Sequence, residues 1–214
     1  MIRTSFAMLA GGLMLGATLG ASAASPAQTD PARTSRQAAD LSHGEQLFLG
    51  CVSCHGSDGE GQPSGDTPAI AGQHRSTVIR QLNDFRRGMR WDVRMEAVAS
   101  QHRLPHPQDI QDIAAFVSSL PVQPTGDHGD GAGLAQGELV YAGLCASCHG
   151  QSAAGSDRAV VPRLAGQSYR YLLRQMYNTV DHRRPNLTAT HESLFRSLTQ
   201  QEVQDTADYL SRLR

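Results

Sequence analysis

The chain has 214 residues, of which 39% are hydrophobic, 18% are charged and 4 are cysteine. All 19 basic residues are arginine, and the formal net charge of −1 argues against a generally basic nucleic-acid binder. The chain mixes charges with short apolar stretches, which excludes a polytopic membrane protein and a fully disordered chain.

Residues 1–23 are predicted to be a secretory signal peptide that is cleaved near Ala23. Arg3 precedes an apolar stretch, and the segment ends in Ala21-Ser22-Ala23. A retained membrane anchor is the weaker alternative, because the apolar stretch of about 14 residues is shorter than the roughly 20 that span a bilayer. Residues 24–40 lack apolar periodicity and are expected to form a flexible leader. The mature chain is therefore expected in the periplasm, without a membrane span.

The chain contains an internal repeat. Cys51-Val-Ser-Cys54-His55 recurs 94 residues later as Cys145-Ala-Ser-Cys148-His149, and residues 68–73 recur at the same offset as 162–167. Residues 109–116 recur as 202–209, now offset by 93. Residues between the repeats are rich in Pro, Gly and Asp, which is typical of a linker. We expect two related domains, residues 41–120 and 135–214, joined by a linker over 121–134.

Both repeats favour helices over strands. A capping-box pattern from Ser42 to Glu45 predicts a helix that runs into the first cysteine pair. Apolar residues at helical spacing predict further helices around 78–85 and 172–180, the first of them ended by Gly88, and around 110–120 and 203–213. A second capping box from Thr199 to Glu202 begins the last of these. The predicted fold class is all-α, and domains of about 80 residues with few aromatics need something else to fill their cores.

The two Cys-x-x-Cys-His motifs indicate covalent haem c. Two thiols one helical turn apart reach the two vinyl groups of a haem, and the adjacent imidazole turns onto the iron. Tetrathiolate zinc, a thioredoxin-like redox pair and structural disulfides are the alternatives. Zinc-binding pairs are normally closer in sequence, the redox pair needs a β-α-β context, and disulfides leave both histidines unexplained. We therefore expect two haem c groups, bound to Cys51, Cys54, Cys145 and Cys148, with His55 and His149 on the irons.

With these motifs, the chain resembles the two-domain, dihaem class I cytochromes c of the cytochrome c-four type. The resemblance covers residues 41–214 and also includes the Pro-x-x-Ala-Gly-Gln segments and the Phe85-Arg-Arg-Gly88 segment. It implies that the carbonyls of Pro68 and Pro162 hold the iron-binding histidines. It also implies two domains wrapped around one haem each. A plain turn proline is compatible with the same pattern.

The sixth iron ligand of the first domain is expected to be Met95, which lies 40 residues after His55. A class I domain places a methionine at this distance, and its soft thioether raises the reduction potential of the haem. Met89 is the competing ligand. Either methionine is also a plausible core residue.

The second domain departs from the family pattern, because its one methionine, Met176, lies inside a predicted helix and is expected in the core. His191 lies 42 residues after His149, in a segment that resembles the one that carries the family's methionine. We expect bis-His ligation of the second haem, with His182 or an open iron as alternatives. Imidazole donates more strongly than thioether, so the second haem is expected to have the lower potential.

The expected function is periplasmic transfer of single electrons between respiratory partners such as a dehydrogenase, a quinol-oxidising complex or a terminal oxidase. The alternatives are a dihaem oxidoreductase that uses an open second haem on a small inorganic substrate, and a haem-based sensor. Several arginines either form a docking surface for an acidic partner or make local ion pairs: Arg86, Arg87, Arg90, Arg94, Arg183 and Arg184.

Overall fold

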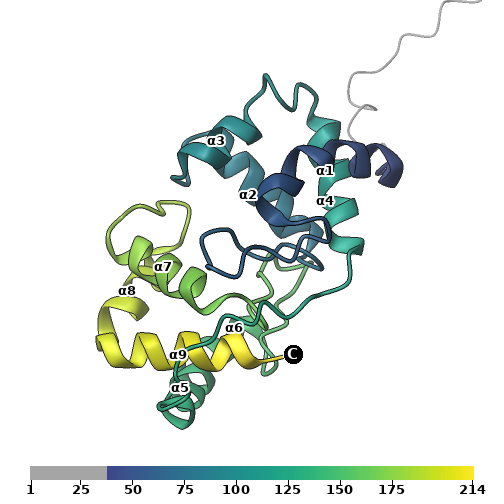
Figure 1. The fold of residues 1–214 in the computed structure, drawn as a ribbon. Coiled ribbons are helices and arrows are strands. Elements are labelled where there is room, and N and C mark those ends of the chain that lie inside the picture. Colours follow the sequence, from purple (N-terminus) through teal and green to yellow (C-terminus); the bar gives the residue numbers. More distant parts are fainter. Residues whose placement is uncertain (1–37) are drawn as a thin grey trace, which may run out of the picture. The chain divides into compact units, whose positions relative to one another are not determined.

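The computed structural model describes residues 38–214, so the predicted signal peptide and most of the expected leader lie outside the described residues. The helices in chain order are α1 (Leu41–His55), α2 (Arg75–Arg86), α3 (Val93–Ala99), α4 (Pro107–Ser119), α5 (Leu134–Val140), the π-helix η2 (Tyr141–Cys145), α6 (Ala146–His149), α7 (Tyr169–Val180), α8 (Ala189–Ser197) and α9 (Gln200–Arg212) (Figure 1). Across residues 38–214, the only strand-like pairing is an isolated bridge between Ser156 and Val161. The predicted all-α fold is confirmed, and none of these helices is long and apolar enough to cross a membrane.

The first helical set packs α1 and α2 against α4. Its core joins Phe48 of α1, Phe85 of α2 and apolar residues of α4, and the ring of Phe48 lies 5.3 Å from that of Phe116, centroid to centroid. Gly44 allows the close approach of α1 to α4, because a Cβ there would lie 2.3 Å from the carbonyl oxygen of Asp112. The short helix α3, which the sequence did not predict, closes this set on the side of α2.

The N-cap of helix α1 lies two residues before the predicted cap at Ser42. The N-cap is Asp40, whose carboxylate accepts a hydrogen bond from the His43 backbone N–H at 3.0 Å, so the expected Ser42–Glu45 capping box is wrong. Aspartate is as good an N-cap as serine, and here it precedes the first helical residue. The second predicted capping box is confirmed, because Thr199 and Glu202 exchange both hydrogen bonds at the start of α9.

Asp112 ties α4 to the beginning of α1. Its carboxylate is almost fully buried and accepts hydrogen bonds from the Asp40 backbone N–H at 2.9 Å, the His43 ring Nδ1 at 2.8 Å and the Gln108 side chain at 2.8 Å. The hydrogen bond to Asp112 raises the pKa of His43. A buried carboxylate is stable only when its oxygens are satisfied, and three donors meet that need.

The second helical set packs α5 and α7 against α9, with Tyr141 and Leu210 fully buried. The counterpart of Gly44 is Gly137, which would also clash with α9 if it carried a Cβ. This pair is 93 residues apart, whereas the cysteine pairs are 94 apart. The extra residue lies in the π-helix Tyr141–Cys145, which interrupts the segment that is one continuous α-helix in the first repeat. A π turn inserts a residue without breaking the helix.

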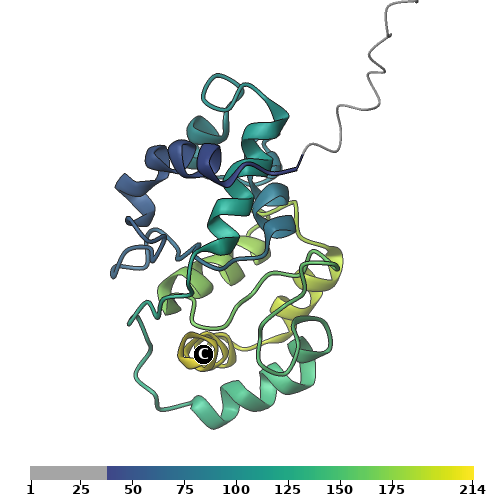
Figure 2. The ribbon, with the colours of Figure 1, turned by 90° about the vertical axis from the view of Figure 1, so that its right-hand side faces the viewer.

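The connection between the sets is held against the second set rather than extending freely. Asp127 is buried and accepts hydrogen bonds from the Ser168 hydroxyl at 2.6 Å and the Arg170 backbone N–H at 3.0 Å, at the beginning of α7. Asp208 of α9 accepts from the backbone N–H groups of Gly129 and Gly131. The connecting chain is visible in Figure 2 between the end of α4 and α5. The buried carboxylates of Asp127 and Asp208 therefore hold the connection against the second set.

Candidate functional site

One large cavity of about 1840 Å³ opens between the helices of both sets. Its wall includes Leu82, Phe85 and Val117 from the first set and Leu172, Met176 and Leu210 from the second. A pocket for one typical ligand measures about 300–1,000 Å³, so this space suits two large apolar groups. The cavity borders the buried apolar cluster of each small domain. The sequence predicts that these domains have too few large apolar side chains to fill their own cores.

Both cysteine pairs line this cavity. Cys51 and Cys54 lie in the last turns of α1, and Cys145 and Cys148 lie at the equivalent place in η2 and α6. All four are free thiols, and burial raises the pKa of Cys51 and of Cys145 to about 11. Among residues 38–214, no group of three or more His, Cys, Asp or Glu side chains is placed to hold a metal ion, so the two pairs do not form a tetrathiolate zinc site. The placement therefore favours covalent attachment of a group in the cavity.

The histidine after each pair is held by a proline carbonyl. The ring Nδ1 of His55 lies 3.0 Å from the carbonyl oxygen of Pro68, and Nδ1 of His149 lies 3.2 Å from that of Pro162. Both histidines are buried and line the cavity. Burial lowers the pKa of each imidazole, which favours the neutral form that binds a metal. With Nδ1–H donating to a carbonyl, Nε2 is the nitrogen left to coordinate.

In the first domain, Met95 lines the cavity and Met89 does not. Met95 lies in the first turn of α3, where Asp92 caps the helix and accepts a hydrogen bond from the Met95 backbone N–H at 3.3 Å. Its side chain packs against the buried cluster of the first set. Met89 is 45% exposed and lies outside the cavity wall.

In the second domain, His191 faces His149. The two ring centroids are 6.3 Å apart, with the ring planes at 82°. Imidazole nitrogens bind first-row metals at about 2 Å, so a metal between two imidazoles leaves roughly 6 Å between their ring centres. His182, the alternative ligand, is 67% exposed, lies outside the cavity wall and contacts Glu192 at 3.6 Å.

Thr188 orients the ring of His191. Its hydroxyl lies 3.0 Å from Nδ1 of His191, and its backbone carbonyl accepts from the His191 N–H at 3.0 Å. Thr188 is the N-cap of α8, yet its side chain makes no capping hydrogen bond to the helix backbone. The hydroxyl is thus available to the imidazole, and Nε2 is left for the cavity. The sequence alone does not identify Thr188, because the helix that it precedes, α8, is not predicted from the sequence.

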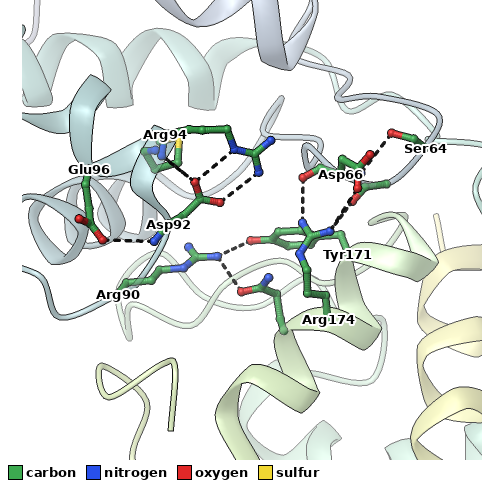
Figure 3. Close-up of polar contacts among 11 residues, drawn as sticks. Ser64, Asp66, Arg90, Asp92, Arg94, Glu96, Tyr171 and Arg174 are labelled. Carbon is green, nitrogen blue, oxygen red and sulfur yellow. Dashed lines mark hydrogen bonds and ion pairs between the residues drawn. The ribbon is translucent and has the colours of Figure 1, made fainter. Parts of the chain in front are cut away.

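A cluster of arginines lines the cavity between the two sets. Figure 3 shows three of them, Arg90, Arg94 and Arg174, with their polar contacts. Arg90 is buried, and its guanidinium donates to Gln175 at 2.9 Å and hydrogen-bonds the hydroxyl of Tyr171. Burial, together with the charge of Arg90, lowers the pKa of Arg184 to about 9. Although burial alone would raise it, the pKa of Tyr171 is lowered, because the neighbouring guanidiniums favour its anionic form.

The arginine cluster suits a ligand that carries carboxylates. The Nε atoms of Arg80, Arg163 and Arg184 are buried and have no hydrogen-bond partner among residues 38–214. Buried donors are normally paired, and buried cations need anions close by. A haem carries carboxylate side chains on one edge and apolar groups over the rest. The cavity therefore offers apolar walls, thiols, imidazoles and buried cations in the combination that such a group requires.

The arginines suggested as a docking surface differ in their contacts. Arg86 donates to the carbonyls of Ala99 and Leu104, both at 2.8 Å, and therefore holds α2 to the segment after α3. Arg90 and Arg184 belong to the cavity, as described above. Arg94 pairs with Asp92 at 3.2 Å and is exposed, as are Arg87 and Arg183, and Arg183 also lies on the cavity wall. Local structural roles therefore account for most of this arginine pattern.

Comparisons with known proteins agree with this site. The family model for cytochrome c matches twice, over residues 41–121 and 134–214. The chain is 27% identical to a cytochrome c4 of Pseudomonas aeruginosa over 186 residues, which covers 82% of this chain and 90% of that protein. It is 29% identical to a thiosulfate dehydrogenase electron acceptor of Stutzerimonas stutzeri, covering 77% of this chain and 79% of that protein. The crystal structure of reduced recombinant cytochrome c4 from Pseudomonas stutzeri superposes with a TM-score of 0.72 at 27% identity, over 83% of this chain and all of that one.

Proposed function

Since the chain belongs to the cytochrome c family, as two tandem cytochrome c domains with two covalently bound haem c groups, we propose that it shuttles single electrons between respiratory partners in the periplasm. In this proposal, His55 and Met95 ligate the first iron. His149 and His191 ligate the second. The domain limits are residues 41–120 and 135–214, and the signal peptide is removed near Ala23.

The spacing of the two imidazoles in the second domain carries this proposal. A ring separation of 6.3 Å between His149 and His191 matches what one metal between two histidines requires. Both rings are presented from fixed positions, His149 by the Pro162 carbonyl and His191 by the Thr188 hydroxyl. A closed, six-coordinate iron suits electron transfer, whereas substrate chemistry needs an open position.

Haem iron supplies reversible one-electron exchange when bound, and the residues of this chain tune it. The proline carbonyls hold each proximal imidazole in the tautomer that coordinates through Nε2. The apolar wall excludes water from the site. Arg80, Arg163 and Arg184 line the cavity and supply positive charge for the carboxylates of the cofactors. Because imidazole is a stronger donor than thioether, His191 lowers the reduction potential of its site relative to the site that holds Met95.

The partners are proposed to be a dehydrogenase or quinol-oxidising complex on the donor side and a terminal oxidase on the acceptor side. A relative of similar length is named as the electron acceptor of thiosulfate dehydrogenase, which supports a dehydrogenase as the donor. Electron-transfer encounters are small and short-lived, so they need only a modest contact surface near each cofactor.

Optical spectroscopy of the protein with both haems attached tests the ligand assignment. Met95→Ala is expected to remove the near-infrared Met-to-iron charge-transfer band of the oxidised protein, while Met89→Ala leaves it unchanged. His191→Ala is expected to convert one of the two haems from low spin to high spin, while His182→Ala leaves both low spin. High-spin haem already present in the unmodified protein would contradict the closed second site and would favour the dihaem oxidoreductase instead.

A further inference from the structure

Two glutamines at equivalent places in the repeat, Gln73 and Gln167, reach from each domain into the other. Each follows the proline loop of its own domain by five residues, and both line the cavity. The offset between them is that of the cysteine motifs, so the two contacts are related by the same duplication as the haem sites. Both side chains are half-buried.

Each carboxamide hydrogen-bonds both backbone groups of one residue in the opposite domain. Gln73 donates through Nε2 to the carbonyl of Arg163 at 3.0 Å and accepts from the Arg163 N–H at 2.9 Å. Gln167 donates to the carbonyl of Ala69 at 2.8 Å and accepts from the Ala69 N–H at 3.1 Å. A two-point contact of this kind fixes direction as well as distance.

The backbone that is gripped in this way also orients the iron-binding histidines. Ala69 follows Pro68, so the Ala69 N–H and the Pro68 carbonyl belong to one peptide plane. A peptide plane is rigid, and fixing the direction of its N–H fixes that of its C=O. That carbonyl holds Nδ1 of His55 at 3.0 Å. By the same logic, Gln73 fixes the plane between Pro162 and Arg163, whose carbonyl oxygen lies 3.2 Å from Nδ1 of His149.

We propose that Gln73 and Gln167 are reciprocal positioning residues, each of which holds the ligand-orienting carbonyl of the other domain's haem site. This rests on the proposed function only in taking His55 and His149 as iron ligands. A firm hydrogen bond at Nδ1 raises the basicity of the imidazole and favours ferric iron. The potential of each haem is therefore partly set by a side chain from the opposite domain.

The test uses the full holoprotein with Gln167→Leu and Gln73→Leu, each the matched control of the other. Gln167→Leu is expected to raise the midpoint potential of the first haem more than that of the second. It should also speed hydrogen exchange at Nδ1 of His55 by about two- to tenfold, the effect of weakening one hydrogen bond. Gln73→Leu is expected to act on the second haem and on His149. A general loss of stability would not make each variant act mainly on the haem of the opposite domain, so this pattern distinguishes the positioning role from destabilisation.

Gln167→Glu extends the test if the leucine variants load haem poorly. Glutamate keeps an acceptor for the Ala69 N–H and loses the donor, so exchange at His55 should rise by less than in Gln167→Leu. The proposal is overturned if each leucine variant disturbs the haem of its own domain, or both haems equally, or neither. In the unmodified protein, ring protons of His55 and His149 that lack hyperfine shifts would instead overturn the ligand assignment, and the proposal with it.

Discussion

Replacing Thr188 with valine is expected to raise the reduction potential of the second haem. Valine keeps the shape of threonine and removes the hydroxyl that lies 3.0 Å from Nδ1 of His191. The Nδ1–H bond makes the imidazole a stronger donor, which favours ferric iron, and its loss therefore favours the ferrous state. The backbone carbonyl of Thr188 still accepts from the His191 N–H, so α8 is expected to keep its start.

The size of the effect follows from the strength and exposure of that hydrogen bond. A neutral hydrogen bond contributes about 0.5–1.5 kcal/mol, which corresponds to about 20–60 mV for one electron if the bond acts on one oxidation state alone. Thr188 is exposed, so water replaces part of the lost interaction. We therefore expect a rise in the lower part of this range, about 20–30 mV.

Spectroelectrochemical titration of the two haems measures this shift. Thr188→Ser keeps the hydroxyl and is expected to retain the original potential. Thr190→Val, which removes a hydroxyl from a neighbouring residue of the cavity wall, is the matched control and should have no comparable effect. An unchanged potential in Thr188→Val, or an equal shift in Thr190→Val, would refute the role assigned to the hydroxyl.

Three further predictions concern stability, measured by denaturant unfolding of the holoprotein. Asp112→Ala removes the acceptor of three hydrogen bonds and should cost about 2–3 kcal/mol, whereas its counterpart Asp205→Ala, which loses the bond from Gln201, should cost about 1 kcal/mol; equal losses would contradict this reasoning. Because the pKa of His43 is raised in the folded protein, the His43–Asp112 pair contributes fully to the free energy of unfolding below about pH 6.5, and this contribution is lost as pH rises through the raised pKa. The free energy of unfolding of the first domain should therefore fall as pH rises over this range, and His43→Gln should abolish this pH dependence. Tyr141→Phe leaves the Gly150 carbonyl without its 2.6 Å partner and should cost about 1–2 kcal/mol; a neutral result would mean that water reaches that carbonyl.

The sequence predicted the parts of this molecule that depend on local pattern. The long amphipathic helices α4, α7 and α9 have strong apolar periodicity, and each was expected. The short helices α3 and α8 were missed, because seven to nine residues carry too little periodicity to be distinguished from a loop. The all-α fold and the two haem c groups followed from the repeat itself.

The contacts between the two domains could not be predicted from the sequence. Gln73 and Gln167 recur in the repeat, but recurrence does not show that a side chain crosses to the other domain. The sequence also does not distinguish the half-buried Arg184 from its exposed neighbour Arg183, because the two share one local sequence context. Such contacts depend on how two domains pack, and no local pattern encodes that packing.

The π-helix Tyr141–Cys145 records how the two halves of the chain have diverged since duplication. An extra residue in a regular helix would rotate everything beyond it by roughly 100°, because each residue advances the helix by 1/3.6 of a turn. The widened turn absorbs that residue locally, so Gly137 keeps its approach to α9 while Cys145 and Cys148 still face the cavity. Removal of one residue from 141–145 would give this segment the same glycine-to-cysteine spacing as the first half. The two ends of this helical segment are therefore positioned by separate contacts, Gly137 by its close approach to α9 and the cysteines by the cavity.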